Sequence, residues 1–275
     1  MQASTLLNKF HLFPVENIVG NVDVFHSSDW TQPPTRQAKR VTTIHDLVPI
    51  LYPKESHSEI VSAHKKRLEW VKREVDTVIA VSESTKNDII SDLGISEDKI
   101  SVVYEAPDIS VKKMGKEKIE EVRRKYNLPS EYLLAVGANP RKNIERITKA
   151  VGRIRGAPPL VVIGRGWNKL TPSEAERNNV LCPGYINDDE DFATILTGAA
   201  VLVYASRYEG FGLPILDAFL CEVPVVTSNV SSMPEVAGGA AILVNPHEVD
   251  DISRGIKEAL NDKRQLIRRG KARVK

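Results

Sequence analysis

The sequence is poor in cysteine and has almost no excess of charge of either sign. Its two cysteines, Cys182 and Cys221, have neither the number nor the spacing of a disulfide framework or a zinc site. We therefore expect a reducing compartment, the cytoplasm. The formal net charge is +2, from 38 Lys and Arg against 36 Asp and Glu. This balance argues against a nucleic-acid binder, so any anion site should be local.

Leader segments, long apolar runs and early glycines are also scarce. No basic-then-apolar leader opens the chain, and no apolar run approaches the roughly 20 residues of a membrane-spanning helix. We therefore expect a soluble or peripheral protein. In the first hundred residues only Gly20 and Gly94 are glycine, whereas a phosphate-binding loop after a first strand needs several. The N-terminal half is expected to lack such a loop.

The pattern of apolar residues predicts an α/β protein with two Rossmann-like domains. A chain of 275 residues with 41% hydrophobic content favours two domains. Short β-branched runs alternate with amphipathic segments, which predicts βα units and parallel sheets. The expected strands are 22–27, 41–46, 77–82, 100–104, 132–137, 160–164, 200–205, 224–227 and 241–244. The polar stretch 106–118 is the predicted linker, so one domain is expected over 1–108 and the other over 109–275.

One predicted helix, from about Ser58 to Val75, carries a basic face. Its apolar stripe includes His64, which we interpret as a hydrogen-bonded core histidine rather than a ligand or base. The cations that lie largely off that stripe are Lys65, Lys66, Arg67, Lys72 and Arg73. The favoured interpretation is a solvated face. The alternative is a peripheral membrane contact, because acidic lipid headgroups gain about 1 kcal/mol from each nearby cation.

The most informative segment runs from Ser206 to Pro214, with the sequence SRYEGFGLP. It follows an apolar strand and leads into a helix, and this succession of strand, glycine turn and helix forms an anion-binding geometry. Gly210 and Gly212 allow a tight turn with exposed N–H groups, and Pro214 suits the first helical turn. Glu209 stands at the mouth of this turn, an unusual place for a residue that only contacts solvent.

Arg141 and Lys142 are a second group of candidates. They follow the strand 132–137 within the segment GANPRKN, which begins at Gly137. Fixed cations at such a position stabilise negative charge on a bound group without a metal. A helix N-terminus disfavours cations unless an anion is also bound there, so this position favours a phosphate site over a surface pair.

The segment around Glu209 resembles family 4 of the retaining glycosyltransferases, which have the GT-B fold of two Rossmann-like domains. Glu209 and Asp217, in their EGFGLP context, are similar to the E-x7-E signature of that family, with aspartate in place of the usual second glutamate. The resemblance implies that Glu209 contacts the donor sugar and stabilises a charge-separated transition state, and that Asp217 binds the ribose. Glu222 stands where members commonly have glycine, so a different local bend is expected.

The same resemblance assigns the remaining donor-binding positions to the C-terminal domain. It implies that Arg141 and Lys142 bind the phosphates and that the loop with Tyr185 and Ile186 holds the base. The other donor-side positions are Gly137, Gly210, Phe211, Gly212, Leu213 and the closing loops 227–229 and 232–238. The run 189–191 looks superficially like the D-x-D metal motif of another fold. Acidic residues at a helix start explain it, and no metal is expected.

Two histidines of the first half are candidate sugar contacts. His45, in TTIHDL, closes a predicted strand and resembles the histidine that faces the donor sugar in mannosyltransferase-type members. Carboxyl ends of parallel strands face the ligand crevice of such sheets, which favours a functional role for His45 over a buried structural one. His26 ends the preceding predicted strand and is a candidate for the acceptor pocket.

The expected activity is retaining transfer of a hexose, with mannose favoured, from a nucleotide sugar to a hydroxyl of a glycan or lipid-linked acceptor. GDP-mannose is the favoured donor, a UDP-sugar is the alternative, and no cofactor is expected. The N-terminal domain is expected to be abbreviated. A truncated nucleotide-sugar-binding protein, inactive or dependent on a partner subunit, therefore stays open as a second function. A nucleotide-sugar 2-epimerase is a third, which the EGFGLP segment argues against.

Overall fold

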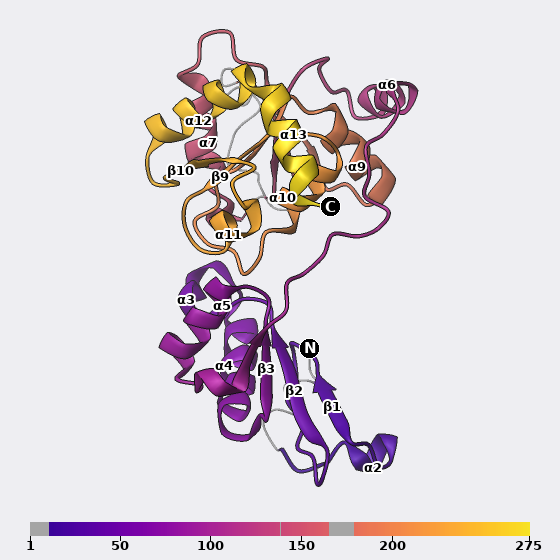
Figure 1. Cartoon of the computed structure of the whole chain (residues 1–275), viewed down its shortest axis with the longest axis vertical. Coiled ribbons are helices and arrows are strands. Elements are labelled where there is room, and N and C mark those ends of the chain that lie inside the picture. The colour runs from indigo at the N-terminus through magenta and orange to yellow at the C-terminus, as the bar shows by residue number, and fades with distance from the viewer. Residues whose placement is uncertain (1–10, 138, 165–178) are drawn as a thin grey trace. The chain divides into compact units, whose positions relative to one another are not determined.

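The computed structural model describes residues 11–137, 139–164 and 179–275. The chain divides into two compact α/β units (Figure 1), unit 1 up to Glu105 and unit 2 from Ala106 onward. This division falls slightly before the expected boundary between residues 108 and 109. Each unit has its own parallel sheet and its own hydrophobic core.

Unit 1 contains a parallel sheet in the order β1-β2-β3-β4. Its strands are β1 (Val24–Ser27), β2 (Lys39–Ile44), β3 (Thr77–Ala80) and β4 (Ile100–Val102). Its helices are α2 (Glu16–Val19), α3 (Val48–Leu51), α4 (Ser58–Glu74) and α5 (Glu83–Asp88), with a π-helical turn Ile89–Leu93 and 3-10 turns Pro53–Glu55 and Glu97–Lys99. The predicted strands of this half are confirmed, with small differences at their ends. Strands that follow chain order form one half of a doubly wound sheet.

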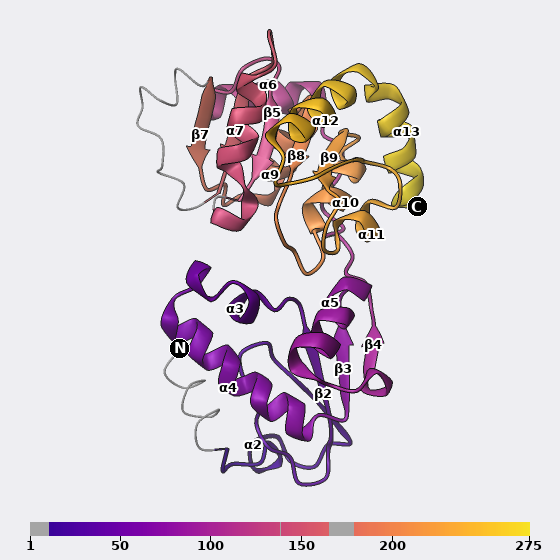
Figure 2. The ribbon, with the colours of Figure 1, turned by 90° about the vertical axis from the view of Figure 1, so that its left-hand side faces the viewer.

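Helix α4 covers one face of this sheet (Figure 2). Its buried side includes one of the predicted surface cations. His64, Leu68 and Val71 are buried as predicted. The assignment of Arg67 to the solvated face was wrong, because its side chain is 1% exposed and pairs with Asp29 at 3.0 Å. Positions 64, 67, 68 and 71 follow the i, i+3, i+4, i+7 spacing of a single helix face, which places this arginine over the sheet.

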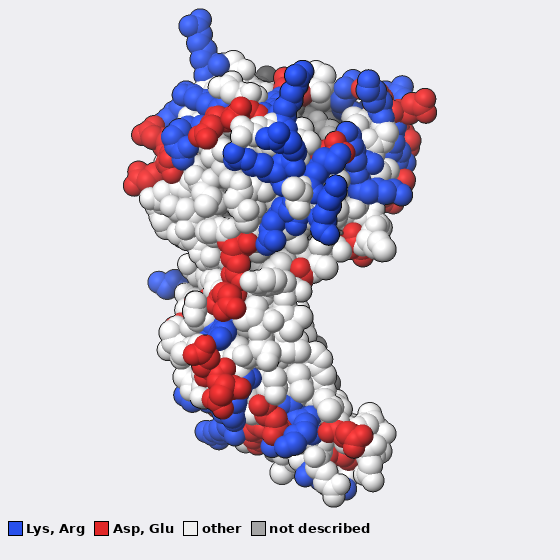
Figure 3. Space-filling view, in the orientation of Figure 1, with Lys and Arg blue, Asp and Glu red and all other residues white. Residues whose placement is uncertain are grey.

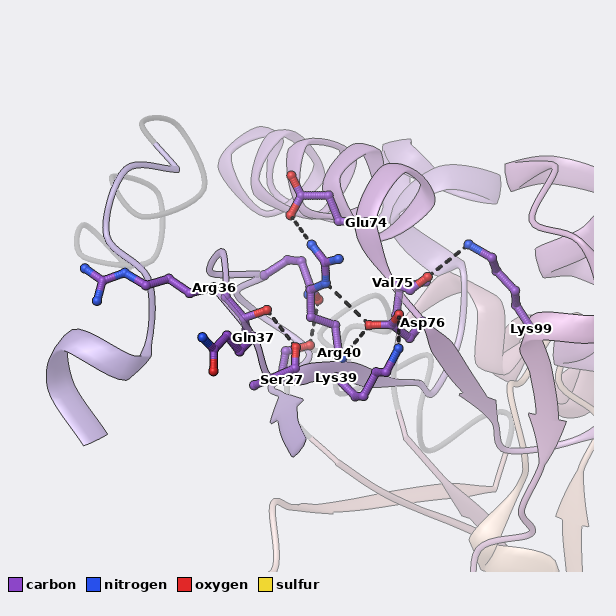
Figure 4. Close-up of polar contacts among 12 residues, drawn as sticks. Ser27, Arg36, Gln37, Lys39, Arg40, Glu74, Val75, Asp76 and Lys99 are labelled. Carbon is purple, nitrogen blue, oxygen red and sulfur yellow. Dashed lines mark hydrogen bonds and ion pairs between the residues drawn. The ribbon is translucent and has the colours of Figure 1, made fainter. Parts of the chain in front are cut away.

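At the amino ends of the strands, Arg40 joins the sheet to helix α4 (Figure 4). Its Nη1 lies 3.2 Å from Glu74 Oε2, and its backbone N–H donates to Asp76 Oδ2 at 2.8 Å. Lys99 Nζ donates to the carbonyl of Val75 at 3.1 Å. These bonds lie away from the carboxyl ends of the strands, where such sheets bind ligands, so we assign them a structural role.

Unit 2 contains a parallel sheet in the order β10-β9-β8-β5-β6-β7. Numbered within the unit, this is the strand order of the dinucleotide-binding Rossmann fold. Its strands are β5 (Leu133–Val136), β6 (Leu160–Ile163), β7 (Val180–Gly184), β8 (Val201–Tyr204), β9 (Val225–Ser228) and β10 (Ile242–Val244). Its helices are α6 (Lys116–Lys125), α7 (Ile144–Gly152), α9 (Asp189–Gly198), α10 (Leu213–Leu220), α11 (Met233–Ala237), α12 (Val249–Asn261) and α13 (Lys263–Arg273), with a 3-10 turn Pro140–Lys142.

Two groups of helices cover the sheet of unit 2. Helix α7 packs against α12, α6 packs against α9, and α10 packs against α13, with the sheet between the first pair and the others (Figure 1). The core joins β5, β6 and β8 to α7 and α12, through buried residues that include Leu133, Leu160, Val203, Ile147 and Ile256. Burial on both faces explains why β6 consists wholly of apolar residues.

Positive charge gathers on the face of unit 2 around α13 (Figure 3). This helix contributes Lys263, Arg264, Arg268, Arg269, Lys271 and Arg273. The chain therefore has a local basic surface, although its net charge is nearly balanced. Among the helices in the part of the chain that the structure describes, none is long and apolar enough to cross a membrane.

Candidate functional site

The strand order of unit 2 locates a candidate site. Strands β5 and β8 are neighbours, and the sheet winds away from them in opposite directions. In open α/β sheets, ligands bind at the carboxyl ends of two such strands. The loops that follow these strands contain Gly137, Arg141, Lys142 and Glu209. The topology therefore brings together segments that the sequence marked separately.

The loop after β5 fixes the two predicted cations. Gly137 has a φ of +86°, and a Cβ at that position would lie 2.9 Å from side-chain carbons of Lys142, so only glycine leaves room for the lysine. The side-chain oxygen of Asn139 accepts a hydrogen bond from the backbone N–H of Lys142 at 3.2 Å. The side chains of Arg141 and Lys142 are only 11% and 15% exposed. Ala138, in the same predicted segment, lies outside the described residues.

The loop between β8 and α10 fixes Glu209. Gly212 has a φ of +112° and directly precedes α10, whose first turn contains Pro214 as predicted. Ser231 and Ser232, which belong to the segment after β9, contact the backbone of this loop. The hydroxyl of Ser231 donates to the backbone carbonyl of Glu209 at 2.6 Å, and the hydroxyl of Ser232 lies 2.9 Å from the same oxygen. The backbone of the candidate catalytic residue is therefore anchored by a part of the chain beyond its own loop.

The carboxylate of Glu209 pairs with both cations. Its Oε1 lies 2.7 Å from Lys142 Nζ and 3.2 Å from Arg141 Nη1, and its side chain is 12% exposed. Burial favours a higher pKa for Glu209, but the positive charges of Lys142 and Arg141 outweigh it and hold that pKa below its usual value. Lys142 Nζ also donates to the hydroxyl of Tyr204 at 2.6 Å. One carboxylate against two cations leaves the site net positive, as an anion ligand requires.

The other residues of the EGFGLP segment form the same turn. Phe211 is buried, and its carbonyl accepts a hydrogen bond from Ser232 Oγ at 2.6 Å. Leu213 begins α10. Of the two glycines, Gly212 has the left-handed φ that favours glycine, and Gly210 precedes it in the turn. The predicted succession of strand, turn and helix is confirmed, and phosphate binding by its N–H groups stays a prediction.

Asp217 lies in α10 with its side chain partly buried. Burial, and then the nearby negative charge of Asp108, raises the pKa of its carboxyl to about 6. This carboxylate therefore differs from Glu209, whose charge is balanced by cations. A partly desolvated carboxylate gains from hydroxyl donors, which suits the implied contact with a ribose, and that contact stays a prediction.

A pocket of about 340 Å³ adjoins the loop after β5. The residues that line it are Val136, Gly137, Asn139, Ile163, Gly164, Tyr185, Ile186 and Phe192. Ile186 is buried, whereas Tyr185 is 52% exposed. The structure thus brings the predicted base-binding loop into one pocket with Gly137. Its largely apolar wall is typical of small-molecule sites, although base binding itself stays a prediction.

The candidate histidines lie in unit 1. His45 directly follows β2, its side chain is 52% exposed, and its Nδ1 lies 2.7 Å from Glu105 Oε1. That hydrogen bond raises the pKa of His45. His26 is exposed in β1, one residue before the strand ends, and its Nε2 lies 2.9 Å from Thr43 Oγ1. The roles of both histidines stay predictions.

Sequence reasoning missed the partners that hold these side chains. Tyr204, Ser231 and Glu105 each reach a candidate residue from a distant part of the chain. No local pattern marks Ser231 or Glu105. Tyr204 alone carried a signal, because it ends an apolar strand directly before the EGFGLP loop.

The acidic run 189–191 lies in the first turn of α9, as predicted. Asp188 precedes α9, and its side-chain oxygen accepts a hydrogen bond from the backbone N–H of Asp191 at 2.8 Å. Asp191 is itself buried and pairs with Lys125 at 2.6 Å. Within residues 11–137, 139–164 and 179–275, no group of three or more His, Cys, Asp or Glu residues could hold a metal ion.

Glu222 lies in a bend whose backbone conformation favours glycine. Its φ is +58°, in the left-handed region where glycine usually ends a helix. The N–H of Val223 bonds to the carbonyl of Ala218 at 2.8 Å, which closes the end of α10. The Glu222 carboxylate also lies 2.8 Å from both Lys113 and Lys271. The bend is therefore that of a glycine, and the ion pairs offset part of its strain.

Both units match models of known families. The model described as "Glycosyl transferases group 1" matches residues 117–273, and "Glycosyltransferase Family 4" matches residues 4–111. The O-antigen chain mannosyltransferase B of Escherichia coli is 33% identical over 241 residues, which cover 83% of this chain and 63% of that protein. The chain thus spans less than two thirds of the length of this relative.

Solved structures share the fold. The Anabaena protein HepE, in complex with UDP and glucose, aligns with a TM-score of 0.70 at 18% identity, over 86% of this chain and 66% of that one. Sucrose-phosphate synthase from Thermosynechococcus elongatus aligns with a TM-score of 0.72 at 21% identity, over 94% and 70%. These likenesses show the GT-B fold of two Rossmann-like domains. Because the first family model covers more than half of the sequence, the chain belongs to the group 1 glycosyl transferases.

Proposed function

We propose that this chain transfers a hexose, with mannose favoured, from a nucleoside-diphosphate sugar to a hydroxyl of a glycan or lipid-linked acceptor. One observation carries the proposal: the Glu209 carboxylate is held between Arg141 and Lys142 at the carboxyl ends of β5 and β8. Open α/β sheets bind ligands at such a place. The group carries the net positive charge that a diphosphate needs.

In this proposal Arg141 and Lys142 bind the diphosphate of the donor. As the bond between sugar and phosphate breaks, negative charge grows on the leaving diphosphate, and preorganised cations stabilise it. Contacts with Tyr204 and Glu209 already hold Lys142 in place before a donor arrives. These side chains supply the positive charge themselves, so we propose that the step needs no divalent metal.

Glu209 is proposed to act on the sugar. It stays ionised beside its cations, and its carboxylate stabilises the positive charge that develops at the anomeric carbon. Retention follows if the acceptor attacks from the face that the phosphate leaves, with the leaving phosphate accepting the proton of the acceptor hydroxyl. Asp217 is proposed to bind the ribose, His45 to orient sugar hydroxyls, and His26 to contact the acceptor.

The names of the relatives support the choice of donor. The relative from Escherichia coli is named a mannosyltransferase, which favours GDP-mannose. The HepE structure holds UDP and glucose, which keeps a UDP-sugar as the alternative. A cytoplasmic location, with peripheral contact to a membrane that carries a lipid-linked acceptor, stays a prediction.

A transfer assay with GDP-mannose, UDP-glucose and UDP-N-acetylglucosamine tests the proposal. Wild type should release nucleotide and form product with one of these donors, and Glu209→Ala should form none. Glu145→Gln is the matched control, because it removes an exposed Glu–Lys pair of the same 2.7 Å length. Wild-type turnover no higher than that of Glu209→Ala would overturn the enzymatic proposal.

Calorimetry with GDP and UDP separates the second function, nucleotide-sugar binding without transfer. Nucleotide binding that Lys142→Ala abolishes, in a protein that forms no product, would favour that alternative. Binding that survives Lys142→Ala and Arg141→Ala would remove the phosphate-site assignment altogether.

A further inference from the structure

We propose that Asp29 and Trp30 form a carbohydrate-binding subsite in unit 1 that receives the acceptor sugar, and that Arg67 positions Asp29. This inference rests on the proposed function, because it assumes that the acceptor is a glycan. It is carried by a buried cation, an exposed aromatic ring and a carboxylate that meet at the carboxyl ends of β1 and β2.

Arg67 is a buried charge that a merely structural helix does not need. Its side chain is 1% exposed, and removing a guanidinium from water costs several kcal/mol unless its partners are well placed. Nη1 donates to Asp29 Oδ1 at 3.0 Å, and Nη2 donates to Thr42 Oγ1 at 2.6 Å and to the carbonyl of Thr43 at 3.1 Å. An apolar side chain of similar volume often stabilises such a position as well or better. The ion pair of Arg67 with Asp29 is therefore better explained by the orientation that it gives to Asp29.

Arg67 holds Asp29 without covering it. The Asp29 side chain keeps 34% of its surface exposed, and the bond to Arg67 occupies one oxygen, Oδ1. The loop that carries Asp29 is also fixed by Ser27, whose Oγ donates to Gln32 Oε1 at 2.7 Å and lies 2.8 Å from Thr42 Oγ1. A partly exposed carboxylate in a fixed orientation is a strong acceptor for sugar hydroxyls.

Trp30 adds an apolar surface beside this carboxylate. The residue is 44% exposed, and its ring meets that of His64 in an edge-to-face arrangement, with ring centroids 4.9 Å apart and planes at 63°. His64 is buried in α4, so the ring rests on a fixed base. An aromatic face packs against the C–H groups of a pyranose while a neighbouring carboxylate accepts from its hydroxyls. Sites of this type combine an apolar surface with a few placed polar groups.

The charges around Asp29 favour a neutral polyol over a phosphate. The parallel register pairs Ser27 with Thr42, so the loop after β1 lies beside the end of β2. Asp29 interacts electrostatically with His45, Asp46 and His64. Its strongest cation, Arg67, is already paired with it. The carboxylates of Asp29 and Asp46 offset the charge of Arg67, so little positive charge is left for a phosphate, whereas sugar hydroxyls can donate to these carboxylates.

The test uses the full chain with methyl α-D-mannopyranoside as the probe. Saturation-transfer NMR measures its binding, and transfer from GDP-mannose to p-nitrophenyl α-D-mannopyranoside gives the acceptor KM. Trp30→Ala should abolish saturation transfer and raise the acceptor KM about tenfold or more, which corresponds to about 1.4 kcal/mol. Trp30→Phe should retain most of the saturation transfer and most of the acceptor affinity. Donor hydrolysis without acceptor should not change in either variant.

Asp29→Asn and Arg67→Met test the polar half of the subsite. Each should raise the acceptor KM while the donor KM and the rate of donor hydrolysis stay at wild-type values. Asp23→Asn, which changes an exposed carboxylate just before β1, is the control. An acceptor KM no higher than that of the control, or a parallel fall in donor hydrolysis, would overturn the inference in favour of a structural pair. If wild type transfers no sugar, the proposed function fails, and the NMR comparison of wild type with Trp30→Ala still decides the subsite.

Discussion

Removing the charge of Glu209 should weaken the fold and strengthen nucleotide binding at the same time. At 2.7 Å, with an effective dielectric constant of about 20, the attraction between Glu209 and Lys142 is about 6 kcal/mol. Desolvation of the two ions offsets most of this, but removing one partner of a buried pair still costs roughly 3–5 kcal/mol. Glutamine keeps the shape, and Lys142 keeps its bond to Tyr204. We therefore expect Glu209→Gln to lower the free energy of unfolding by about 3 kcal/mol, the lower end of that range.

Thermal unfolding with and without GDP measures both effects. A loss of about 3 kcal/mol corresponds to a melting temperature lower by roughly 6–12 °C in a domain of this size. GDP should restore more stability to Glu209→Gln than to wild type, because its phosphates replace the missing anion beside Lys142 and Arg141. We expect GDP to bind the variant about tenfold more tightly, or about 1.4 kcal/mol. Stability equal to that of Glu145→Gln, together with weaker GDP binding, would refute the reasoning.

Three further predictions concern Asp217, the His45–Glu105 pair and Glu222. The folded-state pKa of Asp217 is raised to about 6, so its ionised form destabilises the fold above pH 6, and this penalty disappears as pH falls toward 4. GDP affinity, measured by calorimetry, should also fall below pH 6. Asp217→Asn should lose the pH dependence of both stability and GDP affinity. Glu105→Gln should lower the pKa of His45 in an NMR titration. The stabilisation from this pair is present below the ordinary histidine pKa and is lost as pH rises through the raised pKa of His45. A His45 titration that is unchanged in the variant would exclude the pair. Glu222→Gly should leave stability to urea within about 0.5 kcal/mol, because relief of left-handed strain offsets two exposed ion pairs. Glu222→Ala should cost about 1 kcal/mol, since it keeps the strain and loses the pairs, and equal stability of the two variants would contradict this account.

The sequence predicted features that depend on neighbouring residues. Strands β5 and β8 are short apolar runs, and the glycines after them mark turns, so the positions of their loops follow from the order of residues alone. Gly137 and Gly212 adopt the positive φ angles that make glycine necessary. Glu209 could be identified as a candidate because it stands beside such a turn.

Other features depend on residues far apart in the sequence and could not be predicted. Arg67 looked like one of several solvated cations, because its partner Asp29 lies 38 residues away. The bond from Glu105 to His45 spans 60 residues. The ion pairs of Glu222, which offset the strain of its bend, come from two distant segments. In each case the chain supplies the partner only after it folds.

The anomeric configuration of a product made from GDP-mannose tests the central claim most directly. Incubation with p-nitrophenyl α-D-mannopyranoside, followed by proton NMR of the isolated disaccharide, shows whether mannose is transferred and with which configuration. We predict an α-linked product from wild type and from Glu145→Gln, and none from Glu209→Ala. A β-linked product, or equal product from Glu209→Ala, would contradict the role assigned to Glu209 and its two cations.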